Sequence, residues 1–370
     1  MTRRSRILAV ISAVVALVLA SLAIVFSHDS PCAAPDSLPD STTRMKAIVS
    51  RCYGSPDVLT LEEVAKPTAA ENEVLVKVHA AAVNPLDWHY MRGKPYLMRM
   101  STGLGTPEDA RVGVDFAGTV EAVGSNVTRF KPGDEVYGGK SGALAEYLTV
   151  REDRAVVLKP ANLTFEQAAA VPVAALTALQ SLRDKGQIQP GHKVLINGAS
   201  GGVGTFAVQI AKSFGADVTG VCSTRNVELV RSLGADHVID YTQEDFTQGG
   251  QQYDMILDNV GNRSLSEYRR VLKPKGTLVM VGGGPPTGDP WIGPFTQPIK
   301  AGLLAPFVSQ KLGMFISEMN VKDLEVLNGL MQAGKVTPVI DRRYTLSEAP
   351  AAIRYLEEGR ARGKIIVSLE

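Results

Sequence analysis

The sequence predicts an α/β protein in which a β-rich domain is joined to a doubly wound α/β domain, preceded by one N-terminal transmembrane helix. Three observations predict this. The chain begins with a long apolar run, continues from Lys46 with short strands and turns, and alternates strand with helix from Gly191. A length of 370 residues suits two domains, because a domain takes about 150 residues.

The first 44 residues are predicted to be a membrane anchor and a linker. Residues 7–26 carry no charge and, as a helix, would span roughly 30 Å of hydrocarbon. The alternative is a cleaved secretory signal, but its apolar core is usually shorter, and a small-residue cleavage site is not clear here. Ser27 to Thr43 are rich in Ser, Pro, Ala and Asp, which indicates a flexible spacer with no core to join.

The flanking charges predict which side of the membrane the rest of the chain faces. Arg3, Arg4 and Arg6 precede the apolar run, so we expect an inside N-terminus and an outside main part. Met45 is itself a plausible start, in which case the protein would be cytoplasmic.

Charge and cysteine content exclude several classes. Lys and Arg number 39 against 38 Asp and Glu, so no global field favours nucleic acid as a partner. Cys32, Cys52 and Cys222 show no short spacing, which argues against a disulfide framework and a four-thiolate zinc lobe, and favours a reducing compartment.

Residues 45–172 are predicted to form the β-rich domain. KAIVSRC, DVLTLEEV and NEVLVKVHAAAV are β-rich or alternating, and FAGTVEAVG followed by KPGDEVYG repeats a strand–turn–strand pattern. FEQAAAVPVAALTALQSLRDKG then predicts a helix interrupted near Pro172.

Residues 173–310 are predicted to form the doubly wound domain. HKVLING, ADVTGVCS, HVIDY, YDMILDNVG and TLVMVGG indicate buried parallel strands, and helical segments separate most of them. Residues 311–370 contain two further helices and the strand GKIIVSL, which we expect to return to the β-rich domain.

A glycine-rich turn predicts dinucleotide binding. Residues 197–204, NGASGGVG, follow a predicted strand and open a helix whose N-terminus offers free N–H groups to a pyrophosphate. A tight structural turn is the alternative, but the strand, the helix and a second strand all stand at the required places.

The end of the second strand predicts NADP. Residues 222–226 are Cys-Ser-Thr-Arg-Asn, where an NAD enzyme places a carboxylate on the ribose 2′-hydroxyl. Hydroxyls and the Arg225 guanidinium would accept a 2′-phosphate instead, although Arg225 could merely lie on the surface. Tyr241, Asn259 and residues 281–284 follow the third, fourth and fifth strands, at the sheet edge where such folds bind ligands.

Together VNPLDW, GVDFAGTVEAVG, FKPGDEVYG, AAAVPVAALTALQSL, NGASGGVG and GKIIV resemble the medium-chain dehydrogenase/reductase superfamily, in its zinc-free quinone oxidoreductase-like branch. The resemblance covers residues 45–370 and is closest to quinone oxidoreductase homologues, alkenal or enone reductases and reticulon-interacting mitochondrial oxidoreductases. It implies a GroES-like catalytic domain, a Rossmann domain and a tendency to form homodimers. It also implies that NADPH is contacted by Ser200, Gly201, Gly202, Val203, Ser223, Arg225, Tyr241, Asn259, Val281, Gly282 and Gly283.

The sequence departs from the zinc branch of that superfamily. That branch has a cysteine near the segment 84–87 and a His-Glu pair in the GVDFAG stretch, where this chain has Asp87 and Asp115. The five histidines have no close ligand spacing, so we expect no metal. A zinc-type alcohol dehydrogenase is therefore the weaker alternative.

Without a metal, the expected acceptor is conjugated. An enone, alkenal or quinone takes hydride at a vinylogous carbon, and ordinary hydrogen bonds stabilise the delocalised enolate. A second alternative is a protein that binds NADPH structurally, without turnover. Loops 91–110 and 285–298 are expected to wall the pocket, and the candidate catalytic residues are Asn84, Asp87, His89, Tyr90 and Tyr53. A purely structural hydrogen bond is as plausible for Asp87, and pocket lining is the better interpretation of His89 and Tyr90.

Overall fold

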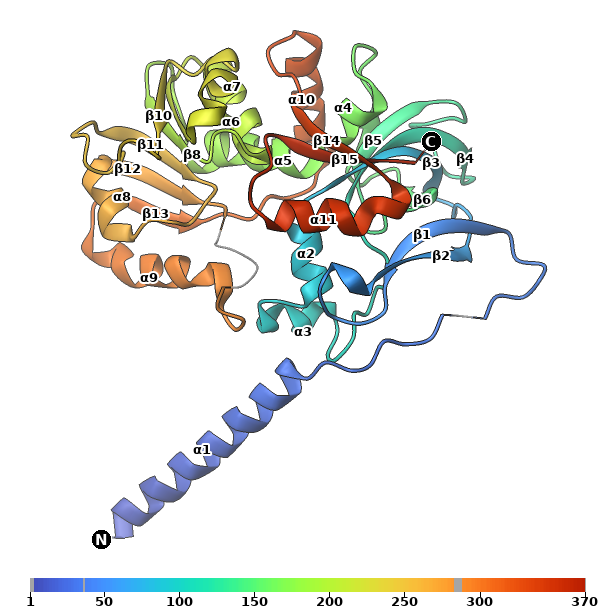
Figure 1. Cartoon of the computed structure of the whole chain (residues 1–370), viewed down its shortest axis with the longest axis horizontal. Coiled ribbons are helices and arrows are strands. Elements are labelled where there is room, and N and C mark those ends of the chain that lie inside the picture. The colour runs from blue at the N-terminus through green and yellow to red at the C-terminus, as the bar shows by residue number, and fades with distance from the viewer. Residues whose placement is uncertain (1–2, 36, 283–287, 370) are drawn as a thin grey trace.

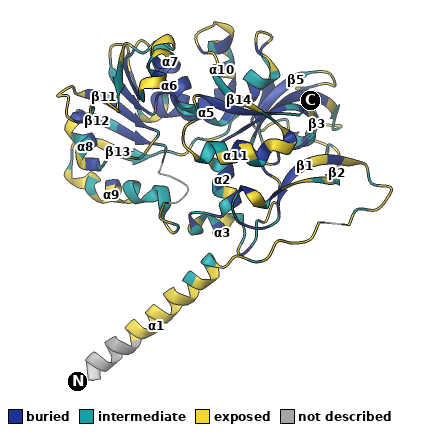
Figure 2. Ribbon diagram, in the orientation of Figure 1, coloured by how far each residue is buried: buried dark blue, intermediate teal, exposed yellow. Residues whose placement is uncertain are grey.

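Two large β-sheets organise the chain in a computed structural model, which describes residues 3–35, 37–282 and 288–369, with residues 3–10 described by their backbone alone. The sheets lie side by side in the body of the molecule, and a single helix extends away from it (Figure 1). Buried residues concentrate along the two sheets and the helices between them (Figure 2).

The β-rich domain is built on a seven-stranded sheet. Its strand order is β14-β15-β3-β4-β5-β7, with β6 pairing β3, and most of its pairs are antiparallel. A separate antiparallel pair, β1 with β2, lies beside it. The strands are β1 (Arg44–Ser50), β2 (Leu59–Ala65), β3 (Glu73–Val83), β4 (Asp115–Val123), β5 (Glu135–Gly139), β6 (Tyr147–Arg151), β7 (Val156–Leu158), β14 (Ile340–Thr345) and β15 (Lys364–Ser368).

The second domain has a six-stranded parallel sheet in the order β10-β9-β8-β11-β12-β13. This order, third-second-first-fourth-fifth-sixth along the domain, is that of the doubly wound dinucleotide-binding fold, so the prediction is confirmed. Its strands are β8 (Lys193–Asn197), β9 (Asp217–Cys222), β10 (His237–Asp240), β11 (Tyr253–Asp258), β12 (Leu272–Met280) and β13 (Lys311–Met314), and its helices are α6 (Gly202–Ser213), α7 (Val227–Ser232), α8 (Leu265–Val271) and α9 (Thr296–Leu304).

The two domains are joined twice by the chain. The predicted interruption near Pro172 separates α4 (Phe165–Ala169) from α5 (Pro172–Gln180), and α5 packs against α6 and α10 (Val321–Gln332). After α11 (Ala349–Glu357), β15 pairs with β3, so the returning strand is confirmed. The predicted boundary at residue 310 is too early, because β13 continues the parallel sheet beside β12.

The first helix, α1 (Arg3–Ser27), extends out of the body, and its apolar side chains from Ile11 to Val25 are mostly exposed (Figures 1 and 2). Within the residues whose side chains are described, no helix is both long enough and apolar enough to cross a membrane.

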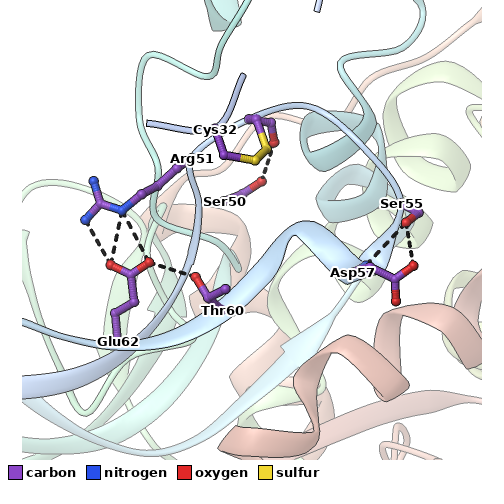
Figure 3. Close-up of a disulfide and its surroundings, with 8 residues drawn as sticks. Cys32, Ser50, Arg51, Ser55, Asp57, Thr60 and Glu62 are labelled. Atoms are coloured by element: carbon purple, nitrogen blue, oxygen red, sulfur yellow. Dashed lines mark hydrogen bonds and ion pairs between the residues drawn. A yellow bond between two sulfur atoms is a disulfide. The ribbon is translucent and has the colours of Figure 1, made fainter. Parts of the chain in front are cut away.

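The segment after α1 is fixed to the body, which corrects two predictions. Cys32 forms a disulfide with Cys52, just beyond β1 (Figure 3), so the cysteines do not all remain thiols. The guanidinium of Arg99, which is 1% exposed, donates to the carbonyl oxygens of Phe26 and His28 and pairs with Asp29 at 2.7 Å. The composition of the segment after α1 predicted a free spacer. The residue that holds this segment, Arg99, lies 70 positions after Asp29, so the local sequence gives no sign of the contact.

Candidate active site

The glycine-rich turn forms a cradle between β8 and α6. Gly198 has φ +79°, and Gly201 is the N-cap of α6. A Cβ on Gly204 would collide with the carbonyl oxygen of Gly198, so only glycine lets α6 begin so close to the turn. A Cβ on Gly201 would meet nothing nearer than 3.6 Å, so this side of the turn is open. The first N–H groups of α6 and its positive end therefore suit a bound phosphate.

Asn226 connects the turn to the end of the second strand. It is buried, and its Nδ2 donates to Ser200 Oγ at 2.9 Å and to Ser223 Oγ at 3.3 Å. Its Oδ1 is buried and has no hydrogen-bond partner among the described residues. Asn226 was not among the predicted site residues, although a polar residue just after a strand end is a usable signal. Ser200 and Ser223 are thus brought together.

Arg225 lies at the rim of the site. It is exposed, and its Nη2 donates to the carbonyl oxygen of Arg360 at 2.7 Å, across the boundary between the domains. Tyr241 is also exposed. A carboxylate that the sequence analysis missed lies beside them, because Thr224 Oγ1 donates to Asp240 Oδ2 at 2.6 Å. The Thr224 hydroxyl is therefore already used, which leaves Ser223 and Arg225 as the predicted groups for a ribose phosphate.

The fourth and fifth strands end against the same turn. Asn259 donates from Nδ2 to the carbonyl oxygen of Asn197 at 3.1 Å, and its buried Oδ1 has no partner among the described residues. A Cβ on Gly282 would collide with the carbonyl oxygen of Asn259, and the Val281 N–H donates to the Asp258 carbonyl at 2.9 Å. These predicted residues therefore share one edge of the sheet. Gly283, the remaining predicted contact, lies outside the described residues.

Beside this edge, a buried ion pair between Asp115 and Lys364 contacts Asn84, the first residue of the predicted catalytic segment. Lys364 Nζ lies 3.1 Å from Asp115 Oδ2 and donates to Asn84 Oδ1 at 2.6 Å. Asn84 Nδ2 in turn donates to Asp115 Oδ2 at 2.9 Å, and the Val173 N–H donates to Asp115 Oδ1. Burial raises the pKa of Asp115, while Lys364 and these two donors oppose the rise. Both side-chain polar atoms of Asn84 are therefore engaged within this network.

Lys364 was missed by the sequence analysis, although it stands in the quoted GKIIV segment. A lysine within an apolar strand is a signal, because buried lysines are nearly always paired. Lys364 also lies where the two domains meet, because a Cβ on Gly202 of the second domain would come within 3.2 Å of Lys364 Cδ.

Asp87 and His89 lie on α2 (Pro85–Arg92), which Asn84 caps. Asp87 Oδ2 accepts from the Asn84 N–H at 2.6 Å, and burial raises the pKa of Asp87 to about 7. His89 Nδ1 lies 2.7 Å from the Lys94 carbonyl, which can only accept, so Nδ1 carries the proton. Burial lowers the pKa of His89, which keeps its ring neutral and makes it a poor proton donor.

Tyr90 and Tyr53 differ in their relation to Asp87 and Asn84. Tyr90 is 43% exposed, and burial followed by the charge of Asp87 raises its pKa. The Tyr53 hydroxyl donates to the Gly103 carbonyl at 2.8 Å, and its ring lies over Arg99 at 4.3 Å. Tyr53 therefore packs against Arg99 and Gly103, in the segment that holds the residues after α1. The structure does not group Tyr53 with Asn84 and Asp115.

The two loops predicted to wall the pocket do meet. The Tyr96 N–H donates to the Pro290 carbonyl at 2.8 Å, and the Tyr96 and Trp291 rings make an edge contact at 5.0 Å.

The two positions that match the zinc branch's ligands hold Asp87 and Asp115. In the described part of the chain, no three His, Cys, Asp or Glu side chains are grouped to hold a metal ion. Asp115, the residue at the zinc branch's His-Glu position, is instead neutralised by the ammonium of Lys364. The glycine cradle and the two unpartnered amide oxygens, by contrast, fit a dinucleotide.

Comparisons with known proteins agree with this division. The alcohol dehydrogenase GroES-like domain family matches residues 70–161, and the family described as zinc-binding dehydrogenase matches residues 233–367. The chain is 37% identical to a 2-methylene-furan-3-one reductase of Solanum lycopersicum over 88% of this chain and 79% of that one. It is 35% identical to a chloroplastic NADPH-dependent alkenal/one oxidoreductase of Arabidopsis thaliana over 94% of this chain and 86% of that one.

A solved quinone oxidoreductase from Coxiella burnetii is similar in fold, with a TM-score of 0.78 and 31% identity, covering 89% of this chain and all of that one. The chain belongs to the medium-chain dehydrogenase/reductase superfamily, in its quinone oxidoreductase-like branch.

Proposed function

We propose that this chain is an NADPH-dependent, zinc-independent oxidoreductase that transfers hydride to a quinone or an α,β-unsaturated carbonyl compound. The observation that carries the proposal is the Asp115–Lys364 pair, which neutralises the carboxylate at the zinc branch's ligand position with a cation of the chain itself. The relatives named above, which reduce a methylene-furanone and an alkenal or enone, support the same acceptor class.

The residues that would hold NADPH are those of the cradle and its rim. Ser200 to Val203 would face the pyrophosphate, and Ser223 with Arg225 would take the ribose 2′-phosphate. Asn259, Val281 and Gly282 would border the far half of the cofactor. When bound, NADPH supplies the hydride.

The acceptor chemistry follows from these groups. A hydride added at the β-carbon of an enone leaves an enolate whose charge is shared between carbon and oxygen, so neutral hydrogen-bond donors suffice. A proton is then added at the α-carbon, from water or a side chain. His89 is kept neutral with Nδ1 engaged, which favours water over His89 as the proton source.

We further propose that α1 is a single-pass membrane anchor. Residues 7–26 form a charge-free apolar run within this 25-residue helix, and the finding above that no helix could cross a membrane covers only the part of this run from Ile11 onward. The Cys32–Cys52 disulfide supports the outside orientation, because disulfides persist in oxidising compartments. The homodimer implied by the resemblance stays a prediction.

A cofactor and acceptor screen tests the enzymatic proposal. Chelator-dialysed full-length protein should consume NADPH, and NADH more slowly, when a short enone or a quinone is added. Arg225→Glu should weaken NADPH and spare NADH, whereas Arg231→Glu, on the exposed surface of α7, should change neither. NADPH binding without consumption would instead identify a binding protein without turnover, and activity restored only by zinc would identify an alcohol dehydrogenase.

A further inference from the structure

A stripe of exposed apolar side chains runs along α9 and the turn that follows it, Ala305–Phe307. Ile299 and Leu303 are four residues apart in α9 and so share a face, Phe307 ends the turn that follows, and Leu303 and Phe307 are 72% and 84% exposed. Ala301, in the same helix, is fully buried. A helix usually buries such a stripe against another element, but among the described residues this face is left exposed.

A second apolar group lies on the loop and short helix α3 (Arg99–Thr102) of the other domain. Leu97, Met100 and Leu104 are exposed, Met100 at 74%. The two groups belong to segments that touch, because Tyr96 of this loop contacts Pro290 and Trp291, which lead into α9. Apolar patches that continue across two elements mark binding surfaces.

The α3 part of this surface lies next to the base of α1. Figure 1 shows α3 and α9 on the side of the body from which α1 departs. Arg99 of α3 makes the connection: it donates to the carbonyl oxygens of Phe26 and His28, and its guanidinium lies near the rings of Tyr53 and Tyr96. The Ser30 N–H also donates to the Gly105 carbonyl at 3.0 Å.

We propose that the apolar side chains of this surface, Leu97, Met100, Leu104, Ile299, Leu303 and Phe307, rest in the interfacial layer of the lipid bilayer that anchors α1. The inference rests on the proposed anchor. A helix whose end is held to the body by Arg99 brings one side of that body to the membrane, and this side exposes the apolar side chains described above. Interfacial apolar groups are commonly buried about 5 to 10 Å into the headgroup and acyl boundary.

Quenching of tryptophan fluorescence by brominated lipid tests the proposal in the full-length protein. Phe307→Trp places a reporter on the surface, and Leu158→Trp, at a site that is 52% exposed on β7, is the matched control. In vesicles of brominated phosphatidylcholine, Phe307→Trp should lose much of its added emission, while Leu158→Trp should keep it. Adding Met100→Glu and Leu303→Glu to the reporter should restore emission with the protein still vesicle-bound.

The outcomes separate this proposal from the anchor. Equal emission from the two reporters in protein that sediments with vesicles would overturn the docking surface alone. Protein that stays in solution would overturn the anchor and the surface with it. Concentration-dependent dimerisation that shields Phe307→Trp from lipid would also overturn it, in favour of a second copy as the cover. NADPH consumption by soluble enones does not depend on any of these results.

Discussion

At the level of single residues, the site depends on a lysine and a carboxylate that are 249 positions apart in the sequence. The GVDFAG stretch predicts that Asp115 replaces a metal ligand, but it gives no indication of what neutralises the carboxylate. That partner arrives only when β15 returns to pair with β3. Polar residues at the glycine turn could be predicted because motif spacing is local, whereas this pair depends on tertiary structure.

Lys364→Met should destabilise the protein by about 3 to 5 kcal/mol, because it leaves Asp115 buried without its cation. Lys212→Met, which removes a more exposed pair with Asp236, should cost about 1 kcal/mol or less. Denaturant unfolding measures both. Equal losses would mean that the Asp115–Lys364 pair contributes no more than a surface ion pair.

Asp87 should make stability pH-dependent. Its pKa is raised from 3.8 to about 7 in the folded protein, so between these values the native state holds a proton that the unfolded state has released. The free energy of unfolding should therefore fall as the pH rises from about 4 to about 7. Asp87→Asn should flatten that part of the profile, measured by denaturant unfolding at several pH values. An unchanged slope would place the responsible group elsewhere.

At the level of elements, two connections matter most. One is the glycine-rich turn into α6, and the other is the set of Arg99 contacts with Phe26, His28 and Asp29, which we call the clamp. The first could be predicted, since the glycines, the strand and the helix are contiguous in sequence. The second could not, because a segment rich in Ser, Pro and Asp resembles a free linker unless the buried guanidinium of Arg99 is known.

The glycines of the turn should separate folding from binding. Gly204→Val should lower stability by roughly 1 to 3 kcal/mol or more, because its side chain meets the Gly198 carbonyl. Gly201→Val should leave the melting temperature nearly unchanged and weaken NADPH binding, because its side chain projects into the open cradle. Calorimetry and NADPH titration distinguish the two. Undiminished NADPH affinity in Gly201→Val would move the pyrophosphate away from the turn.

The clamp can be opened with one substitution. Arg99→Met should expose residues 26–31 to protease, because it removes the donors to Phe26, His28 and Asp29. Arg111→Met, which breaks an exposed pair with Asp109, is the control and should leave cleavage unchanged. Fragments cut within residues 26–31 should separate without a reductant, because Cys32 and Cys52 both lie on the C-terminal side of such a cut. Equal cleavage of both variants would contradict the clamp.

At the level of the whole molecule, periodicity and turn residues predicted two sheets, their order along the chain and the late return of β15. The boundary at residue 310 was wrong because β13 is only four residues long and carries no strong pattern. The oxidised Cys32–Cys52 pair was missed because its residues are distant in sequence and meet only through the docked linker.

The most direct measurement follows deuterium from NADPH to product. Chelator-dialysed protein is given a short enone and NADPH that carries deuterium at the transferable C4 position, and the product is analysed by mass spectrometry and NMR. The account predicts a saturated carbonyl product with one deuterium on the carbon β to the carbonyl and a solvent proton on the α-carbon. Deuterium on the carbonyl carbon of an alcohol, or no transfer while NADPH stays bound, would contradict it.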